Sequence, residues 1–169
     1  LNEVYGVQSS EFRVQSSSPI ERNSERETLN SELVMLAWED MLKTYKIPLE
    51  IPLDLMKGVL MDTHINRYKT FEELYVYCYR VASTVGLMSS EILGYSDKKT
   101  LEYAEALGIA MQLTNILRDV KEDALMNRIY LPQEDLEKFK VTEKQIFANE
   151  LNENFIELMK FQIARAREF

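Results

Sequence analysis

Apolar residues recur at α-helical spacing along most of the chain, and no segment alternates apolar and polar residues strongly enough to indicate a strand. The helical pattern starts near Glu27 and continues with Leu29, Leu33, Leu36, Ala37 and Met41. The residues before it are polar and rich in serine, with only weak periodicity. We therefore predict a loosely held N-terminal segment at residues 1–27 and a helical core at residues 28–169.

Capping residues and helix breakers divide this core into separate helices. Thr70 followed by Glu73 fits a capping box, in which the two side chains satisfy backbone N–H groups at a helix start. Gly94 then marks the end of that helix, because glycine readily adopts the left-handed conformation of a C-terminal cap. The predicted fold class is all-α, with the helices packed as a bundle or at larger crossing angles. The predicted helices cover residues 52–63, 71–93, 98–124, 132–139, 142–150 and 154–167.

The composition is typical of one soluble globular domain, with 169 residues, 46% hydrophobic and 28% charged, and a formal net charge of −8. The acidic balance argues against nucleic-acid binding, which depends on Lys and Arg neutralising phosphates. A single cysteine, Cys78, and a single histidine, His64, exclude an internal disulfide and the zinc sites rich in Cys or His. No segment reads as a membrane span or a secretory signal, so a cytoplasmic location is expected.

An acidic ridge is the most informative feature of the helix predicted over residues 98–124. Asn115, Asp119 and Asp123 stand at i, i+4 and i+8, so their side chains stack along one face. Like charges at this spacing repel, and the helix dipole disfavours anions near a C-terminus. A hard divalent cation such as Mg²⁺ would offset both effects, because it prefers oxygen ligands and binds one or two carboxylates together with substrate phosphates.

Arg118 stands beside this ridge, where its guanidinium could bind a phosphate that the same cation holds. The alternative interpretation is an ordinary amphipathic helix with a solvated acidic face, which is the commoner outcome of such a pattern. The spacing alone does not decide between the two.

A stripe of mostly small side chains follows the helix predicted over residues 71–93. Its members are Cys78, Ala82, Val85, Gly86 and Ser89. Glycine inside a helix costs about 1 kcal/mol relative to alanine, so Gly86 is expected to have a packing or binding reason. Either a neighbouring helix approaches closely along the stripe, which is the commoner case, or an apolar ligand lies along it.

Two blocks of sequence carry a resemblance to a known family. Residues 77–88 read YCYRVASTVGLM, and residues 106–123 read ALGIAMQLTNILRDVKED, followed by NRIYLP at residues 127–132. In these blocks the chain resembles the squalene/phytoene synthase family, whose members join two allylic prenyl diphosphates head to head. The resemblance runs from about Trp38 to Phe139, and the blocks stand in the family's order.

This resemblance implies an isoprenoid-synthase-type helical bundle around a central cavity that holds two prenyl diphosphates. It implies Mg²⁺, which Mn²⁺ could replace, bound by two aspartate-rich motifs on facing helices, and it gives no indication of NADPH. The residues implied as catalytic are Tyr77, Asp119 and Asp123, those implied as metal ligands are Asn115, Asp119 and Asp123, and those implied as substrate contacts are Gln112, Arg118, Ala82 and Gly86.

The first aspartate-rich motif is the point at which the chain departs from the family pattern. An aspartate pair at i, i+4 is implied upstream of the two blocks, but no such pair precedes Asp62. The chain therefore corresponds to the middle of the family domain or to a shortened member, and by itself it holds half of a metal site.

The function implied by the resemblance is the Mg²⁺-dependent condensation of two geranylgeranyl diphosphates to phytoene, a step of carotenoid biosynthesis. One alternative is a synthase of squalene, dehydrosqualene or presqualene diphosphate that uses farnesyl diphosphate. The other is a non-catalytic member that serves as a binding or assembly protein. The expected partners are prenyl diphosphates and not nucleic acid. Peripheral membrane contact rests only on the lipid-like product, and the sequence indicates no oligomeric state.

Overall fold

The computed structural model describes the backbone of residues 19–169 and the side chains of residues 30–169. Most of the predicted N-terminal segment lies outside the described residues, so its boundary at residue 27 stays a prediction. The chain divides into two compact units, residues 1–44 and residues 45–169. Helix α1 (Pro19–Tyr45) covers the described part of the first unit and begins earlier than the predicted start near Glu27. Proline is tolerated in the first turn of a helix, where its missing N–H would have had no intrahelical partner.

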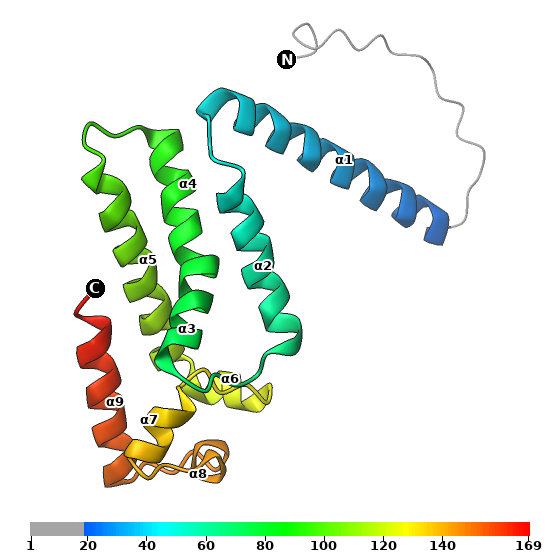
Figure 1. The fold of residues 1–169 in the computed structure, drawn as a ribbon. Coiled ribbons are helices and arrows are strands. Elements are labelled where there is room, and N and C mark those ends of the chain that lie inside the picture. Colours follow the sequence, from blue (N-terminus) through cyan, green and yellow to red (C-terminus); the bar gives the residue numbers. More distant parts are fainter. Residues whose placement is uncertain (1–18) are drawn as a thin grey trace, which may run out of the picture. The chain divides into compact units, whose positions relative to one another are not determined.

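Helices make up the regular structure of the second unit, and within residues 45–169 the structure has no strand apart from a single bridge between Arg67 and Ile129. Figure 1 shows α2, α4 and α5 running alongside one another, α9 beside α5, and the short helices α6 to α8 gathered at one end. The predicted all-α class is confirmed. The elements are α2 (Glu50–His64), α3 (Phe71–Cys78), η1 (Tyr79–Ser83), α4 (Thr84–Leu93), α5 (Lys99–Arg118), α6 (Val120–Leu125), α7 (Gln133–Lys138), α8 (Glu143–Phe147) and α9 (Glu153–Ala166).

Both predicted ends of the helix over residues 71–93 are present. The Thr70 hydroxyl accepts a hydrogen bond from the Glu73 N–H at 3.3 Å, which confirms the cap. The Glu73 carboxylate accepts from the Lys69 N–H at 2.7 Å, one residue earlier than a standard capping box requires. At the other end Gly94 has a φ of 79°, a conformation that a side chain would strain.

This helix widens in its middle, which the periodicity did not predict. Between Tyr79 and Ser83 it forms one π-helical turn, η1, in which the Thr84 N–H donates to the Tyr79 carbonyl five residues back. Wide turns of this kind occur frequently at functional sites, because the extra residue shifts the faces of the helix on either side.

The helix predicted over residues 98–124 is also interrupted, at Asp119. Helix α5 ends at Arg118 and α6 begins at Val120, with Asp119 at φ −101° and ψ 14° between them. The i→i+4 hydrogen bonds continue through the break, because the Asp119 N–H donates to Asn115 at 2.9 Å and the Asp123 N–H donates to Asp119 at 2.8 Å. The predicted ridge therefore survives the change of helix.

Glycines allow α5 to lie close against η1 and α4. A Cβ on Gly108 would lie 2.5 Å from the Cα of Ser83, and a Cβ on Gly86 would lie 2.9 Å from the carbonyl oxygen of Ala104. Ser83 is fully buried at this contact and donates its hydroxyl to the Glu105 carbonyl at 2.7 Å. The packing reason expected for Gly86 is thus present.

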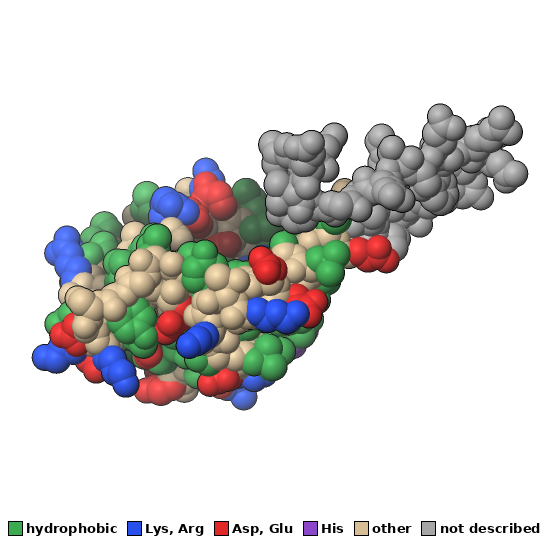
Figure 2. All heavy atoms as spheres, turned by 90° about the horizontal axis from the view of Figure 1, so that it is seen from above, with side chains coloured by type: hydrophobic (Ala, Val, Ile, Leu, Met, Phe, Trp, Pro, Cys, Tyr) green, Lys and Arg blue, Asp and Glu red, His purple; other side chains and the backbone are tan. Residues whose placement is uncertain are grey.

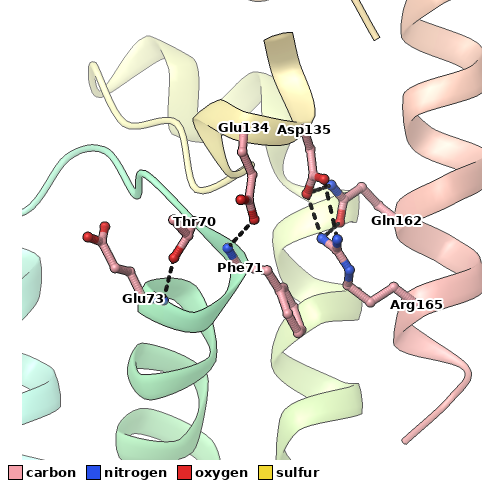
Figure 3. Close-up of polar contacts among 7 residues, drawn as sticks. All are labelled: Thr70, Phe71, Glu73, Glu134, Asp135, Gln162 and Arg165. Atoms are coloured by element: carbon pink, nitrogen blue, oxygen red, sulfur yellow. Dashed lines mark hydrogen bonds and ion pairs between the residues drawn. The ribbon is translucent and has the colours of Figure 1, made fainter. Parts of the chain in front are cut away.

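A buried polar network ties α9 to α7 (Figure 3). Asp135 on α7 is 3% exposed and accepts hydrogen bonds from Gln162 at 2.8 Å and from the Arg165 guanidinium on both carboxylate oxygens. The Arg165 guanidinium also lies over the ring of Phe71, 4.1 Å from its centroid. The Phe71 N–H donates to Glu134 at 2.7 Å, so α7 helps to cap the start of α3.

Charged side chains of both signs lie among apolar ones on the face drawn in Figure 2. In the part of the chain that the structure describes, no helix combines the length and the apolar character that a membrane span requires.

Candidate active site

A groove of about 450 Å³ runs between η1 and α4 on one side and α5 on the other. Four of the residues predicted from the sequence as substrate contacts or metal ligands line it: Ala82, Gly86, Gln112 and Asn115. These side chains come from two helices that the sequence analysis treated separately, so the structure brings together the small-residue stripe and the start of the acidic ridge. Their roles stay predictions.

The groove owes its shape to small side chains and its character to apolar ones. Gly86 and Gly108 let the backbones of η1, α4 and α5 approach closely, and Ala82 adds only a methyl group to the lining. Val81, Leu107 and Met111 supply apolar walls, while the amides of Gln112 and Asn115 stand toward the ridge. A long apolar chain with a polar head is the kind of ligand that such a lining fits.

The acidic ridge leads from this groove along α5 into α6. Asn115 lines the groove, and the Asp119 side chain is 36% exposed. Asp123 is half-buried. Burial, followed by the charge of Asp119, raises the pKa of the Asp123 carboxyl above its ordinary value. A charged group that is desolvated beside a like charge is unfavourable by itself, and a bound cation would reverse that balance.

Arg118 lies apart from the groove. Its guanidinium makes a bidentate ion pair with Asp119, with both N–O distances at 2.6 Å. The pair lowers the pKa of the Asp119 carboxyl, so that carboxylate stays charged over a wide pH range. The Arg118 side chain lines a separate cavity of about 150 Å³ near α8 and α9. The structure therefore places Arg118 on the ridge but does not place it in the groove.

Tyr77 belongs to a cluster of phenols around one carboxylate, which we call the tyrosine–Asp62 cluster (Asp62, Tyr68, Tyr77, Tyr130). The Tyr77 hydroxyl donates to one oxygen of Asp62 at 3.1 Å, and the Tyr130 hydroxyl donates to the other at 2.9 Å. The rings of Tyr77 and Tyr130 stack with centroids 5.3 Å apart. Tyr68 packs against both, at 5.5 Å and 5.9 Å.

The phenols of this cluster are held in their neutral form. Burial, as the largest cause, raises the pKa of Tyr77, Tyr68 and Tyr130 above the ordinary value for a phenol. The nearby Asp62 carboxylate raises all three further, because a phenolate would repel it. Tyr77 is therefore a hydrogen-bond donor and an aromatic surface at neutral pH, and not a base in its phenolate form.

Sequence reasoning missed Asp62 as part of a site. It comes from the end of α2, Tyr77 comes from α3, and Tyr130 comes from the segment before α7, so no spacing along the chain links them. The one available signal was that Arg128 and Tyr130 fall in the NRIYLP block of the family resemblance. The Arg128 guanidinium donates to the Asp62 carbonyl at 3.0 Å.

The ridge connects the groove with this cluster. Asn115 lines the groove at one end, while at the other Asp123 lines a small cavity together with Arg128 and Tyr130. Arg128 lowers the pKa of Asp123 and Asp62 raises it, which places all three charges within electrostatic reach of one another.

The donor set of the ridge fits a hard cation. Among the described residues no group of three or more His, Cys, Asp or Glu side chains could by itself hold a metal ion. The ridge offers two carboxylates, Asp119 and Asp123, and the amide oxygen of Asn115. Mg²⁺ usually takes few protein ligands and completes its shell with water and substrate phosphates, so this incomplete set suits Mg²⁺ better than a metal that needs a full protein cage.

Comparisons with known proteins identify the family. The family model of squalene/phytoene synthases matches residues 8–169. The chain is 44% identical over 146 residues to the 15-cis-phytoene synthase of Synechococcus elongatus, an alignment covering 79% of this chain and 47% of that protein. It is 48% identical over 139 residues to the chloroplastic phytoene synthase of Daucus carota, covering 79% of this chain and 35% of that protein. The chain belongs to the squalene/phytoene synthase family.

Solved structures support the fold. The squalene synthase HpnC of Alicyclobacillus acidocaldarius aligns with a TM-score of 0.74 at 24% identity, over 92% of this chain and 62% of that one. A dehydrosqualene synthase solved in complex with a ligand aligns with a TM-score of 0.66 at 35% identity, over 70% of this chain and 42% of that one. The predicted isoprenoid-synthase-type helical fold is confirmed. The chain spans about half or less of the length of the curated relatives named above.

Proposed function

We propose that the protein carrying this chain condenses two prenyl diphosphates head to head in a Mg²⁺-dependent reaction, with geranylgeranyl diphosphate as substrate and phytoene as product. The observation that carries the proposal is that Asn115 lines an apolar groove, while Asp119 and Asp123 follow it at i+4 and i+8 with the i→i+4 hydrogen bonds unbroken. An apolar chain and a metal-bound diphosphate need these two environments next to each other.

Each part of the site has a distinct task in this proposal. The groove beside Ala82 and Gly86 binds the apolar chain and excludes water from it. Asn115, Asp119 and Asp123 would hold Mg²⁺, which supplies charge neutralisation for the departing diphosphate. Gln112 stands where it can orient the diphosphate head by hydrogen bonding. Arg118 adds positive charge at the ridge through its pair with Asp119.

Departure of diphosphate leaves an allylic cation, which the double bond of the second substrate attacks, and loss of a proton then closes a cyclopropyl intermediate. Departure of the second diphosphate, rearrangement and loss of a second proton give phytoene. The aromatic faces of the tyrosine–Asp62 cluster are suited to stabilising such a cation, because an aromatic ring carries negative charge density on its face. We assign Tyr77 to this role. Its neutral hydroxyl would not trap the cation as readily as a phenolate would.

A second substrate remains a specific alternative, because the dehydrosqualene synthase structure aligns at 35% identity. Farnesyl diphosphate would then give a squalene-type product. The depth of the groove selects between the two chain lengths, and the phytoene synthase relatives at 44% and 48% identity favour the longer one.

The test uses the full-length gene product with Mg²⁺ and labelled geranylgeranyl or farnesyl diphosphate. A C40 product is expected from geranylgeranyl diphosphate, and a C30 product would support the alternative. Removal of the metal with EDTA should abolish product formation, and Mg²⁺ or Mn²⁺ should restore it. If the intact protein binds a prenyl diphosphate but forms no product with any chain length, a binding or assembly role replaces the enzymatic one.

We further propose a cytoplasmic location with peripheral contact at a membrane, because a lipid-like product must leave into an apolar phase. The phytoene synthase of Daucus carota is named chloroplastic, which makes a plastid the alternative location. Imaging of a fluorescent fusion of the full-length protein distinguishes the two.

A further inference from the structure

Asp62 accepts hydrogen bonds from two phenols of separate segments, although it belongs to no aspartate-rich motif. We propose that Asp62 is a positioning residue of the prenyl-transfer site, which fixes the hydroxyls and rings of Tyr77 and Tyr130 as an aromatic wall for the reacting cation. This inference rests on the proposed function, and it adds a carboxylate whose task is neither metal binding nor proton transfer.

Both carboxylate oxygens of Asp62 are in use. One accepts from Tyr77 at 3.1 Å and the other from Tyr130 at 2.9 Å, so the two phenols are held at a fixed separation by a single planar group. An amide in the same place would offer only one acceptor oxygen and would present an NH₂ group to the second hydroxyl. The arrangement therefore depends on the carboxylate itself and not only on the size of the side chain.

The aspartate is held in turn by the segment that carries Tyr130. The Arg128 guanidinium donates to the Asp62 carbonyl at 3.0 Å, which ties the end of α2 to the residues just before Tyr130. A parallel bridge between Arg67 and Ile129 strengthens the same junction. The Ile129 N–H also donates to the Asn66 carbonyl at 3.1 Å, so one side-chain contact and one backbone contact hold the end of α2 against the segment that carries Tyr130.

Tyr68 shows that the hydrogen bonds are selective. Its ring is 1% exposed and packs against both other rings, but its hydroxyl has no hydrogen-bond partner among the described residues. The carboxylate is thus directed at Tyr77 and Tyr130, while Tyr68 contributes only its ring. A hydroxyl that donates to a carboxylate leaves its ring more electron-rich, which strengthens the attraction between the ring face and a cation.

Product formation by the full-length protein tests the proposal through the variants Asp62→Asn and Asp62→Glu. Asp62→Asn is expected to lower kcat about 100-fold with little change in KM, because misplacement by about 1 Å costs that much, whereas Asp62 is not among the residues that line the groove. Asp62→Glu keeps two acceptor oxygens and should recover part of the loss. Asp54→Asn is the matched control, because Asp54 lies on the same helix and forms an ion pair with Lys57 and no other among the described side chains. It should leave kcat unchanged.

Near-UV circular dichroism provides a second readout that does not need catalysis. The tyrosine signal should change in Asp62→Asn and stay constant in Asp54→Asn. If Asp62→Asn fails to fold, Tyr130→Phe replaces it, since it removes one hydrogen bond to Asp62 and keeps the ring. Tyr130→Phe should also lower kcat, with little change in KM.

The outcomes separate this inference from the function on which it rests. Wild-type protein that forms no product removes the proposed function and the positioning role together. Wild-type protein that is active, with Asp62→Asn or its substitute Tyr130→Phe equally active, overturns the positioning role alone. A loss that appears entirely in KM also overturns it, because Asp62 would then act on binding and not on the cation.

Discussion

The groove and the tyrosine–Asp62 cluster are built on opposite principles. The groove lies where two helices pack closely, because Gly86 and Gly108 carry no side chain that would hold the backbones apart. The cluster exists because large polar side chains satisfy one another, with two phenols sharing one carboxylate. The first region therefore tolerates polar changes but not added volume, and the second tolerates no loss of a hydrogen-bond partner.

The acidic ridge lies between the two regions. The largest effect on turnover is therefore expected from a change at Asp119. Asp119→Asn should lower turnover of the full-length protein about 10²–10³-fold, the usual cost of removing one electrostatic contact to a transition state. Helix content should not change, because Asp119 is partly exposed and contributes its backbone to the helix. Glu122→Gln, on the exposed side of α6, is the control and should retain activity. Unchanged turnover in Asp119→Asn would remove the metal-ligand role.

Two variants that each remove one hydroxyl test whether the hydrogen bonds to Asp62 stabilise the tyrosine–Asp62 cluster. Tyr130→Phe removes a hydrogen bond to a carboxylate and should lower the free energy of unfolding by about 1.5–3 kcal/mol. Tyr68→Phe removes a buried hydroxyl that has no hydrogen-bond partner and should leave stability unchanged or raise it slightly. Urea denaturation of both variants makes the comparison. Equal losses would mean that the shared carboxylate is not what distinguishes the two phenols.

Added volume at the groove provides the converse test. Gly108→Ala places a methyl group 2.5 Å from the Ser83 Cα, a backbone atom that cannot rotate away. The free energy of unfolding should fall by about 1–3 kcal/mol. Thr114→Ala, which alters an exposed position of the same helix, is the control for helix propensity and should cost far less. A Gly108→Ala protein as stable as wild type would show that α5 can move away from η1.

The smallest effect is expected at Asp123 and concerns pH. Because the pKa of Asp123 is raised in the folded protein, the folded state binds this proton more readily than the unfolded state does. Its charge therefore lowers stability as pH rises through the folded-state pKa. Asp123→Asn should raise the free energy of unfolding at pH 7 by less than about 0.5 kcal/mol after solvent screening, with a slightly higher melting temperature, and the gain should vanish in acid. The same variant should lose turnover.

The contribution of Asp119 to stability should show the opposite pH dependence. Measuring Asp119 and Asp123 together therefore tests the electrostatic account of the ridge. Arg118 lowers its pKa, so the stabilisation is present above the unfolded-state value and is lost as pH falls through the folded-state value. Thermal melts of Asp119→Asn and Asp123→Asn between acidic and neutral pH compare the two directly. Melting temperatures that shift in the same direction would contradict the electrostatic account of the ridge.

Local signals in the sequence predicted much of the fold. The Thr70 cap and the Gly94 stop are both present, because each depends on hydrogen bonds within a few residues. The π-helical turn at η1 and the break at Asp119 were not predicted. Neither place holds a glycine or a proline, so the sequence carries no local signal for the extra residue of the π turn or for the changed backbone angles at Asp119.

Site residues could be predicted from the sequence where they share one helical face, and not where their place depends on contacts between side chains. Residues that share one helical face were identified from spacing: Ala82 with Gly86, and Asn115 with Asp119 and Asp123. The placement of Arg118 away from the groove depends on its rotamer and on its ion pair with Asp119, which spacing does not specify.

The sequence by itself determined the all-α class, the family and the acidic ridge, because periodicity, motif order and i, i+4 spacing are properties of one continuous segment. Only the tertiary structure decided that the small-residue stripe and the start of the ridge line one groove, and that Asp62 holds two tyrosines from distant segments. Those contacts join residues far apart in the chain, and the physical reason they form is close packing between helices, which no single helix encodes.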